Sequence, residues 1–265
     1  EEHLNVGSTH RSRLMAKLGQ HFLRDEGVAR RMVELAELDR DDVVLEIGTG
    51  DGFLTRHIAS SGCRVITVEL DPVLARRAQE LLRDRPNVTV VQGDALRLEL
   101  PEFNKVVSSP PYYISSRLLR WLSLRARPEL AVLLLQEEFV RKLTSKPGDE
   151  RYVLTSLLVR TAYEVEPRFS VRRSAFVPPP RVSSRVVVLR RKEDSMELPG
   201  WLVEVLRRAF TLRRKRLERV LRSFGFTCPP ELRGLRVREI GPEHIPVLAE
   251  HLKAEMAEKA GQETL

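Results

Sequence analysis

The stretch from Val106 to Ile114 reads Val-Val-Ser-Ser-Pro-Pro-Tyr-Tyr-Ile and combines residue types that could hold a planar base. Its valines have the character of a buried strand, and the prolines that follow fix the backbone and carry no amide donor. The carbonyl groups at the tip of such a strand are therefore free to accept hydrogen bonds. Tyr112 adds a flat apolar face with a polar end. Alone, the stretch also fits an ordinary turn that closes a strand, so its chemistry depends on the motifs upstream.

A glycine-rich turn, Glu46-Ile-Gly-Thr-Gly-Asp-Gly52, follows the first predicted strand. Glycines allow a sharp turn and let a ligand approach the backbone closely. The spacing is G-x-G-x-G, whereas dinucleotide-binding turns have G-x-G-x-x-G. Closely spaced glycines make a poor cradle for a pyrophosphate but leave room for an amino-acid moiety. A plain strand-to-helix turn is the alternative for this motif taken alone.

Acidic residues end the next two predicted strands. Glu69 stands about 20 residues beyond the glycines, where a carboxylate can accept from both hydroxyls of a ribose. Asp71, which precedes a proline, is expected to cap the following helix. Asp94 can accept from an adenine amine, and the amide of Ala95 can donate to a ring nitrogen. Three such elements in order are expected to line the carboxyl edge of a doubly wound sheet, where ligands bind.

Short apolar runs alternate with helical patterns as far as residue 190, which is typical of an α/β fold with a parallel sheet covered by helices on both faces. The predicted strands are 43–47, 64–69, 88–92, 105–108, 131–136, 162–169 and 182–189, and the predicted helices are 53–60, 72–82, 116–124, 137–144 and 154–161. The polar segment from Lys192 to Gly200 has the composition of a linker. Beyond it the pattern is helical, with one helix predicted from Trp201 to Phe224 and another from Pro242 to Met256. We therefore expect one domain at 1–195 and a small all-α domain at 196–265.

The chain of 265 residues carries 45 Lys and Arg against 37 Asp and Glu, a net charge of +8. This excess favours a polyanionic partner, with nucleic acid before a membrane surface. No apolar run is long enough to cross a bilayer. The two cysteines, Cys63 and Cys228, lie far apart and lack the spacing of a metal site. A reduced, cytoplasmic chain with no metal is the simplest interpretation.

Basic residues crowd the helix predicted at 201–224, while its apolar residues form the opposite stripe. They are Arg207, Arg208, Arg213, Arg214, Lys215, Arg216, Arg219 and Arg222. A phosphate backbone would relieve their mutual repulsion and release counterions. A solvated helix face is the alternative, but the density of charge and the basic chain favour RNA. Arg11, Arg13 and Lys17 are expected to extend this surface.

Taken together, the motifs resemble those of S-adenosylmethionine-dependent methyltransferases, and more narrowly those of the small-subunit rRNA adenine dimethyltransferase family. Lys17–Leu23 is similar to the N-terminal motif of that family, Phe176–Ser184 to a late motif, and Ala209–Leu217 to its C-terminal basic helix. The resemblance covers nearly the whole chain. It implies a Rossmann-like methyltransferase sheet followed by a small helical domain that binds rRNA.

Residue by residue, the resemblance implies a cofactor site and an adjoining site for the target base. The N-terminal segment would contact the cofactor through His21 and Leu23, and Gly48 would lie against its methionine part. Glu69 would hold the ribose, and Asp94 with Ala95 would hold the adenine. The remaining residues that it places at the cofactor are Glu46, Gly50, Leu70 and Ser109, and those of the catalytic turn are Ser109, Pro110 and Tyr112.

Two positions depart from the family pattern, since His21 and Ser109 both stand where the family usually has asparagine. In the family, the second asparagine and the next backbone carbonyl accept hydrogen bonds from the adenine amine that attacks the cofactor's methyl group. Here the Pro110 carbonyl remains, and Ser109 offers an acceptor on a shorter arm. Tyr112 would stack on the base, and positioning would supply most of the rate.

The function implied is methylation of adenosine N6, at two neighbouring adenosines near the 3′ end of small-subunit rRNA. The expected partner is this rRNA or a pre-30S particle, the expected state is a monomer, and no membrane partner is expected. Three other interpretations stay open. The chain could be a catalytically silent rRNA-binding assembly factor, a DNA adenine N6-methyltransferase, or a nicotinamide-dependent oxidoreductase, which the glycine spacing disfavours.

Overall fold

The computed structural model describes residues 20–262 of the chain, and the side chains of residues 20–260. The chain divides into two compact units, each built from two segments. The first unit comprises Glu1–Val140 and Glu164–Arg191, and the second comprises Arg141–Tyr163 and Lys192–Leu265. Residues 141–163 thus group with the C-terminal helices, whereas the sequence suggested a single boundary after residue 195. The reason is packing, because Tyr152 and Leu157 are buried in the same apolar cluster as Leu202 and Leu206.

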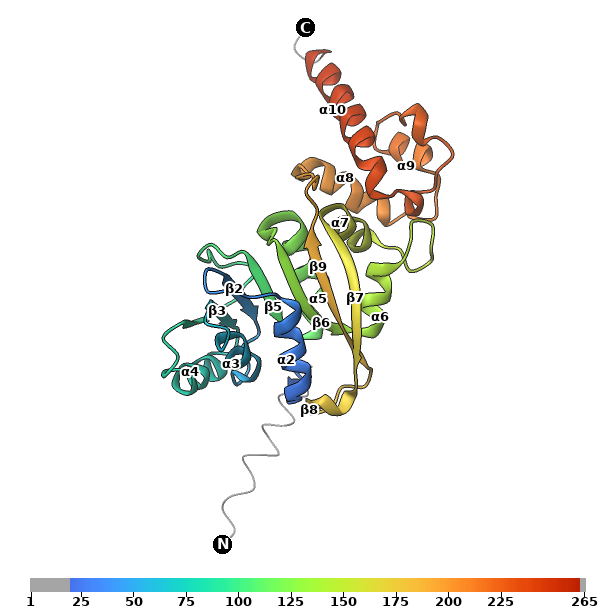
Figure 1. Ribbon diagram of the computed structural model, residues 1–265. Coiled ribbons are helices and arrows are strands. Elements are labelled where there is room, and N and C mark those ends of the chain that lie inside the picture. Colours follow the sequence, from blue (N-terminus) through green and yellow to red (C-terminus); the bar gives the residue numbers. More distant parts are fainter. Residues whose placement is uncertain (1–19, 263–265) are drawn as a thin grey trace. The chain divides into compact units, whose positions relative to one another are not determined.

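The first unit contains a seven-stranded sheet (Figure 1). Its strands, in their order across the sheet, are β4 (Val88–Gln92), β3 (Arg64–Glu69), β2 (Val43–Ile47), β5 (Lys105–Ser108), β6 (Leu130–Gln136), β9 (Ser184–Arg191) and β7 (Tyr163–Val171). The first five are parallel. β9 runs antiparallel to β6, so the predicted parallel sheet is extended at this edge by an antiparallel strand. No α-helix lies between β7 and β9. A parallel strand needs a crossover connection, usually a helix, whereas a strand that reverses direction does not.

Helices cover both faces of this sheet, since the interior strand β6 is buried at every position from Leu130 to Leu135. The helices that begin in this unit are α2 (Glu26–Leu35), α3 (Phe53–Ala59), α4 (Pro72–Leu81), α5 (Ser115–Trp121) and α6 (Glu137–Thr144). Met32 of α2 and Ile58 of α3 pack with strand residues such as Val132 in one core cluster. Asp71 caps α4, as predicted, by accepting hydrogen bonds from two amides of its first turn.

A short antiparallel pair brings the N-terminal segment to the site. β1 (Phe22–Leu23) pairs with β8 (Phe176–Val177), with Phe22 opposite Val177 and Leu23 opposite Phe176. The amide of Arg24 also donates to the carbonyl of Ala175 at 2.8 Å. Segments about 150 residues apart in the chain therefore lie side by side, and the two motifs that distinguish the resemblance form one structure.

The second unit is helical, with α7 (Leu154–Ala162), α8 (Gly200–Phe210), α9 (Leu217–Ser223) and α10 (Ile245–Gln262). The single helix predicted from 201 to 224 is wrong, because residues 211–216 separate α8 from α9. The backbone of that turn pairs with a neighbouring segment: Val237 donates to Lys215, Arg238 to Arg213, and Leu217 to Leu235. These tertiary hydrogen bonds replace those of a continuous helix. Within residues 20–262, no helix is both long and apolar enough to span a membrane.

Candidate active site

The glycine-rich turn between β2 and α3 is closed in by two apolar rings. Gly48, Gly50 and Gly52 have φ angles of 86°, 57° and 81°, in the region that favours glycine. A Cβ atom on Gly50 would lie 2.8 Å from the Phe22 ring, and one on Gly48 would lie 3.1 Å from Cδ of Pro111. Glycines at these two positions therefore let Phe22 and Pro111 pack closely against the turn.

Glu69, at the end of β3, is a buried carboxylate held by two backbone amides. The amide of Gly50 donates to its Oε2 at 2.9 Å, and the amide of Asp71 donates to its Oε1 at 3.0 Å. Burial raises the pKa of Glu69, and these two hydrogen bonds oppose the rise. Each carboxylate oxygen can accept a second hydrogen bond. The fixed group can therefore still receive the two hydroxyls of a ribose.

Glu46, at the end of β2, is anchored beneath the glycine-rich turn. The hydroxyls of Thr55 and Thr67 donate to its Oε2 at 2.5 and 2.7 Å, and Thr49 contacts the Thr67 hydroxyl at 2.6 Å. Burial raises the pKa of Glu46 to about 8, against the two hydroxyl hydrogen bonds that lower it. The shift favours the neutral form of this carboxyl near pH 7. The sequence analysis missed the threonines, since no spacing rule links Thr67 in the next strand to Glu46.

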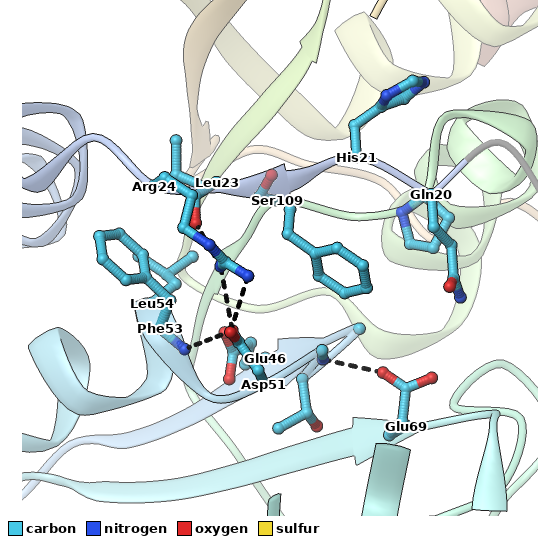
Figure 2. Close-up of a pocket in the computed structure, with 15 residues that line it drawn as sticks. Gln20, His21, Leu23, Arg24, Glu46, Asp51, Phe53, Leu54, Glu69 and Ser109 are labelled. Atoms are coloured by element: carbon cyan, nitrogen blue, oxygen red, sulfur yellow. Dashed lines mark hydrogen bonds and ion pairs between the residues drawn. The ribbon is translucent and has the colours of Figure 1, made fainter. Parts of the chain in front are cut away.

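Two adjoining hollows, each of about 500 Å³, lie at the carboxyl edge of the sheet and share Gln20, Gly48, Glu69 and Pro111. Figure 2 shows the first hollow, with Glu69 on one side and the N-terminal segment on the other. All ten residues predicted to bind the cofactor line one hollow or the other. The first contains His21, Leu23, Glu46, Gly48, Gly50, Glu69 and Ser109, and the second contains Gly48, Glu69, Leu70, Asp94 and Ala95.

Charged residues that the motifs did not indicate also line the two hollows. Arg24 forms an ion pair with Asp51 at 2.8 Å across the mouth of the first hollow. In the second, Arg117 of α5 approaches the Asp94 carboxylate at 3.5 Å, and Arg97, which does not line the hollow, approaches it at the same distance. Asp94 also accepts a hydrogen bond from a backbone amide two residues on. An adenine amine at this carboxylate would share it with the two guanidinium groups.

The Ser-Pro-Pro-Tyr turn follows β5, and its members divide between the first hollow and the space beside it. Ser109 lines the first hollow, whereas Pro110 is buried against Gly48. Tyr112 lines neither hollow, and its hydroxyl lies 2.5 Å from the Ser184 hydroxyl. Burial raises the pKa of Tyr112. Ser184 belongs to a motif that the sequence singled out, but nothing in its spacing indicated this contact with Tyr112.

Two other rings lie near the Tyr112 ring. The ring centroid of His21 is 5.7 Å from that of Tyr112, and the ring of Phe176 meets it edge-on at 6.4 Å. His21 directly precedes β1 and Phe176 belongs to β8, so the β1–β8 pair positions both rings near Tyr112. Of the three, only His21 lines the first hollow, together with Ser109.

The basic residues predicted for RNA lie on α8, on the 211–216 turn and on α9, and most of them have partners within the second unit. Arg213 donates to the backbone carbonyls of Glu150 and Tyr152 at 2.7 and 3.0 Å. Arg214 forms an ion pair with the Glu150 carboxylate at 3.0 Å, and Arg238 pairs with the same group. Hydrogen bonds from Arg238 and Arg214 hold the pKa of Glu150 below its usual range.

Three more of these basic residues also have internal contacts. Arg216 donates to a backbone carbonyl at 2.5 Å, Arg207 pairs with Glu204 at 2.7 Å, and Arg208 lies 4.2 Å from the Phe224 ring centroid. In the described part of the chain, no side-chain hydrogen bond or ion pair is found for the remaining three, all exposed. They are Lys215, Arg219 and Arg222. Arg11, Arg13 and Lys17 lie outside the described residues.

The parallel sheet, the glycine-rich turn after its first long strand and the carboxylate after its second define the class of S-adenosylmethionine-dependent methyltransferases. The family model described as "Ribosomal RNA adenine dimethylase" matches residues 11–228. The chain therefore belongs to the ribosomal RNA adenine dimethylase family.

Individual relatives agree with this assignment. A "Probable ribosomal RNA small subunit methyltransferase A" of Methanothermobacter thermautotrophicus is 40% identical over 257 residues, which cover 91% of this chain and 92% of that protein. Among solved structures, a dimethyladenosine transferase from Plasmodium falciparum has a TM-score of 0.75 at 27% identity, covering 88% of this chain and 98% of that one. The 23S rRNA methyltransferase ErmE has a TM-score of 0.63 at 32% identity, covering 88% and 99%.

Proposed function

We propose that this protein transfers methyl groups from S-adenosylmethionine to N6 of adenosines in small-subunit rRNA. The observation that carries the proposal is the junction at one sheet edge of the two hollows and the Ser-Pro-Pro-Tyr turn. A methyl donor in the hollows and a base beside the turn would meet at Ser109. Curated relatives that are 39–40% identical to this chain carry names that concern the small subunit, which supports the choice of substrate.

The residues present fit this cofactor. Asp94 and the amide of Ala95 suit the adenine, and the carboxylate of Glu69 suits the ribose. Gly48 and Gly50 line the hollow in which the methionine part would lie, and a Cβ atom at either position would crowd Pro111 or Phe22, which line the same hollow. When bound, the cofactor supplies an electrophilic methyl group on a sulfonium.

The protein's contribution to the transfer would be positioning and electrostatics. The adenine amine is a poor nucleophile, because its lone pair is delocalised into the ring. Acceptors that hold its hydrogens favour a pyramidal nitrogen, and the Pro110 carbonyl and Ser109 hydroxyl would fill this role. Tyr112, fixed through its contact with Ser184, would stack on the base. A base in an RNA helix has to leave its stack to reach this turn.

The finer assignment is that two neighbouring adenosines near the 3′ end are each dimethylated, in rRNA or a pre-30S particle, by a monomer in the cytoplasm. A second candidate substrate is large-subunit rRNA, because the solved structure of a 23S rRNA methyltransferase matches nearly the whole chain at 32% identity. We favour the small subunit because the identity to relatives bearing that name is higher, at 39–40%.

The test is methyl transfer from tritiated S-adenosylmethionine into unmethylated small subunits, large subunits and duplex DNA. We expect label in the small subunits alone, and mass spectrometry of the nucleosides should show N6,N6-dimethyladenosine. Label in large subunits would change the substrate, and label in DNA would change the class of enzyme. Tight cofactor binding with no transfer to any of the three would instead indicate a silent assembly factor.

A further inference from the structure

A third hollow, of about 960 Å³, lies on the first unit between α2 and β7, the last strand at one edge of the sheet. None of the residues that line it lines the two hollows described above. They are Arg31, Glu34, Leu35, Pro167, Arg168 and Phe169. Pro167 has no amide donor, so this edge is poorly suited to pairing with a strand of another protein. The hollow therefore calls for a different kind of ligand.

The guanidinium group of Arg31 lies flat on the ring of Phe169. Its central carbon is 3.5 Å from the ring centroid, a van der Waals separation at which two planar groups lie face to face. Phe169 packs against the core cluster of the first unit, so the ring that supports Arg31 is fixed. Arg31 itself is exposed, and the opposite face of its guanidinium is accessible. The hollow thus contains a flat cationic surface held in place.

The donors of Arg31 and the carboxylate of Glu34 are not paired with each other. Within residues 20–262, no hydrogen bond or ion pair is found for the Arg31 side chain. Glu34 lines the same hollow three positions further along α2, and it forms no ion pair with Arg31. Arg185 of the same unit differs, because it pairs with Glu137 at 3.0 Å. The hollow therefore offers a stacking surface and a separate hydrogen-bond acceptor.

An unpaired nucleobase with an amino group fits both features. Unstacked bases of RNA stack on guanidinium planes as well as on aromatic rings. A carboxylate only accepts hydrogen bonds, so Glu34 suits the amino group of cytosine, adenine or guanine and disfavours the carbonyl that uracil has in its place. The same carboxylate disfavours a phosphate inside the hollow. The exposed Arg172 and Arg173, which directly follow β7, are available to phosphates outside it.

We propose that the hollow between α2 and β7 binds an unpaired, amino-bearing base of RNA, which stacks on Arg31 and donates to Glu34. The inference rests on the proposed function for the identity of the polymer. β7 ends five residues before Phe176 of β8, whose ring meets that of Tyr112. A nucleotide in the hollow would therefore hold the RNA on the unit that carries the Ser-Pro-Pro-Tyr turn, separately from the basic residues of α9.

Arg31→Lys tests the stacking surface, because lysine keeps the charge and removes the plane. Arg30→Lys is the matched control, since Arg30 is exposed on the same helix and does not line the hollow. Fluorescence anisotropy of labelled short oligocytidine and oligouridine measures binding. We expect Arg31→Lys to weaken binding of oligocytidine by about tenfold, which is typical of the loss of one stacked base. Arg30→Lys should bind as the parent does. The parent should prefer oligocytidine, and Glu34→Gln should remove that preference.

The outcomes separate this inference from the proposed function. An unchanged affinity of Arg31→Lys for oligocytidine, or an equal loss in Arg30→Lys, would overturn the site. A parent that binds neither oligonucleotide, or both equally, would also overturn it, and this measurement does not depend on the folding of a variant. Calorimetry should give the same cofactor affinity for every variant. A parent that prefers oligocytidine but methylates no rRNA would overturn the proposed function and not the base site.

Discussion

At the scale of single residues, the glycine-rich turn rests on a buried carboxyl group whose pKa is raised in the folded protein. Glu46 sits at the end of β2, and the hydroxyls of Thr55 and Thr67 both donate to one of its oxygens. These contacts connect the turn's first residue to α3 and to β3. A buried carboxyl remains neutral when the free energy needed to bury its charged form exceeds the stabilisation that hydrogen bonds give to that form. Glu46 is thus a structural support of the hollow as well as part of its lining.

Glu46→Gln tests this state through the dependence of stability on pH. The pKa of Glu46 is about 8 in the folded protein and near 4.5 in an ordinary environment. Between these values the folded chain binds a proton that the unfolded chain does not, so the contribution is full below pH 4.5 and is lost as pH rises to 8. Glutamine stays neutral throughout. The free energy of unfolding of Glu46→Gln, relative to that of its parent, should therefore increase from pH 5 to pH 8, with a limiting slope of about 1.4 kcal/mol per pH unit.

Urea unfolding followed through Trp121 in a Trp201→Phe background reports on the first unit. The exposed Glu102→Gln variant is the matched control for removal of a carboxylate. A stability difference between Glu46→Gln and its parent that is the same at every pH would contradict a neutral Glu46.

The sequence indicates the residues that line the two hollows better than the residues that hold them in place. Gly48, Glu69 and Asp94 could be predicted because parallel strands end at one edge, and a ligand there meets whatever follows each strand. The partners of these residues come from elsewhere in the chain. Ser184 meets Tyr112 from 72 positions away, and only the folded sheet brings the two together.

At the scale of elements, the break between α8 and α9 is the main departure from the periodic pattern. Apolar residues from Leu206 to Phe224 keep helical spacing, and residues 201–224 contain no proline or glycine. Local propensity therefore predicts one helix. The turn instead pairs with residues 235–238, and Arg213 reaches back to the carbonyls of Glu150 and Tyr152. Tertiary hydrogen bonds override propensity here, which sequence periodicity does not reveal.

Arg213→Met should destabilise the second unit, because methionine keeps part of the apolar stem and removes both hydrogen bonds to backbone carbonyls. We expect a loss of about 2 kcal/mol in free energy of unfolding, typical of lost charged hydrogen bonds. Arg214→Met is the matched control, since Arg214 is 71% exposed, against 27% for Arg213, and pairs only with a carboxylate at the surface. It should cost less than about 0.5 kcal/mol. Urea unfolding read from Trp201 in a Trp121→Phe background measures both, and equal losses would rule out the anchoring role of Arg213.

At the scale of the whole molecule, the chain has a net charge of +8, and its basic residues serve different roles. Glu150 alone engages Arg213, Arg214 and Arg238, so part of the basic sequence stabilises the second unit. A count of basic residues along a sequence does not distinguish those that stabilise the fold from those that could contact RNA. The exposed residues without such partners are the ones available to a phosphate backbone, and those on the 211–216 turn and α9 are Lys215, Arg219 and Arg222.

Reversing these three charges to glutamate should weaken binding to small-subunit rRNA and leave cofactor affinity unchanged. Each phosphate contact releases counterions, so the slope of log affinity against log salt should fall by about two to three as three contacts are lost. The matched control reverses three exposed arginines of the first unit, Arg76, Arg77 and Arg83, and changes net charge by the same amount. Filter binding across a salt series compares the two sets. If both triple variants weaken binding equally, the rRNA responds to the overall charge of the protein, and α9 is not a specific contact. A larger effect from reversal of Lys215, Arg219 and Arg222 identifies α9 and its preceding turn as the surface that contacts the RNA.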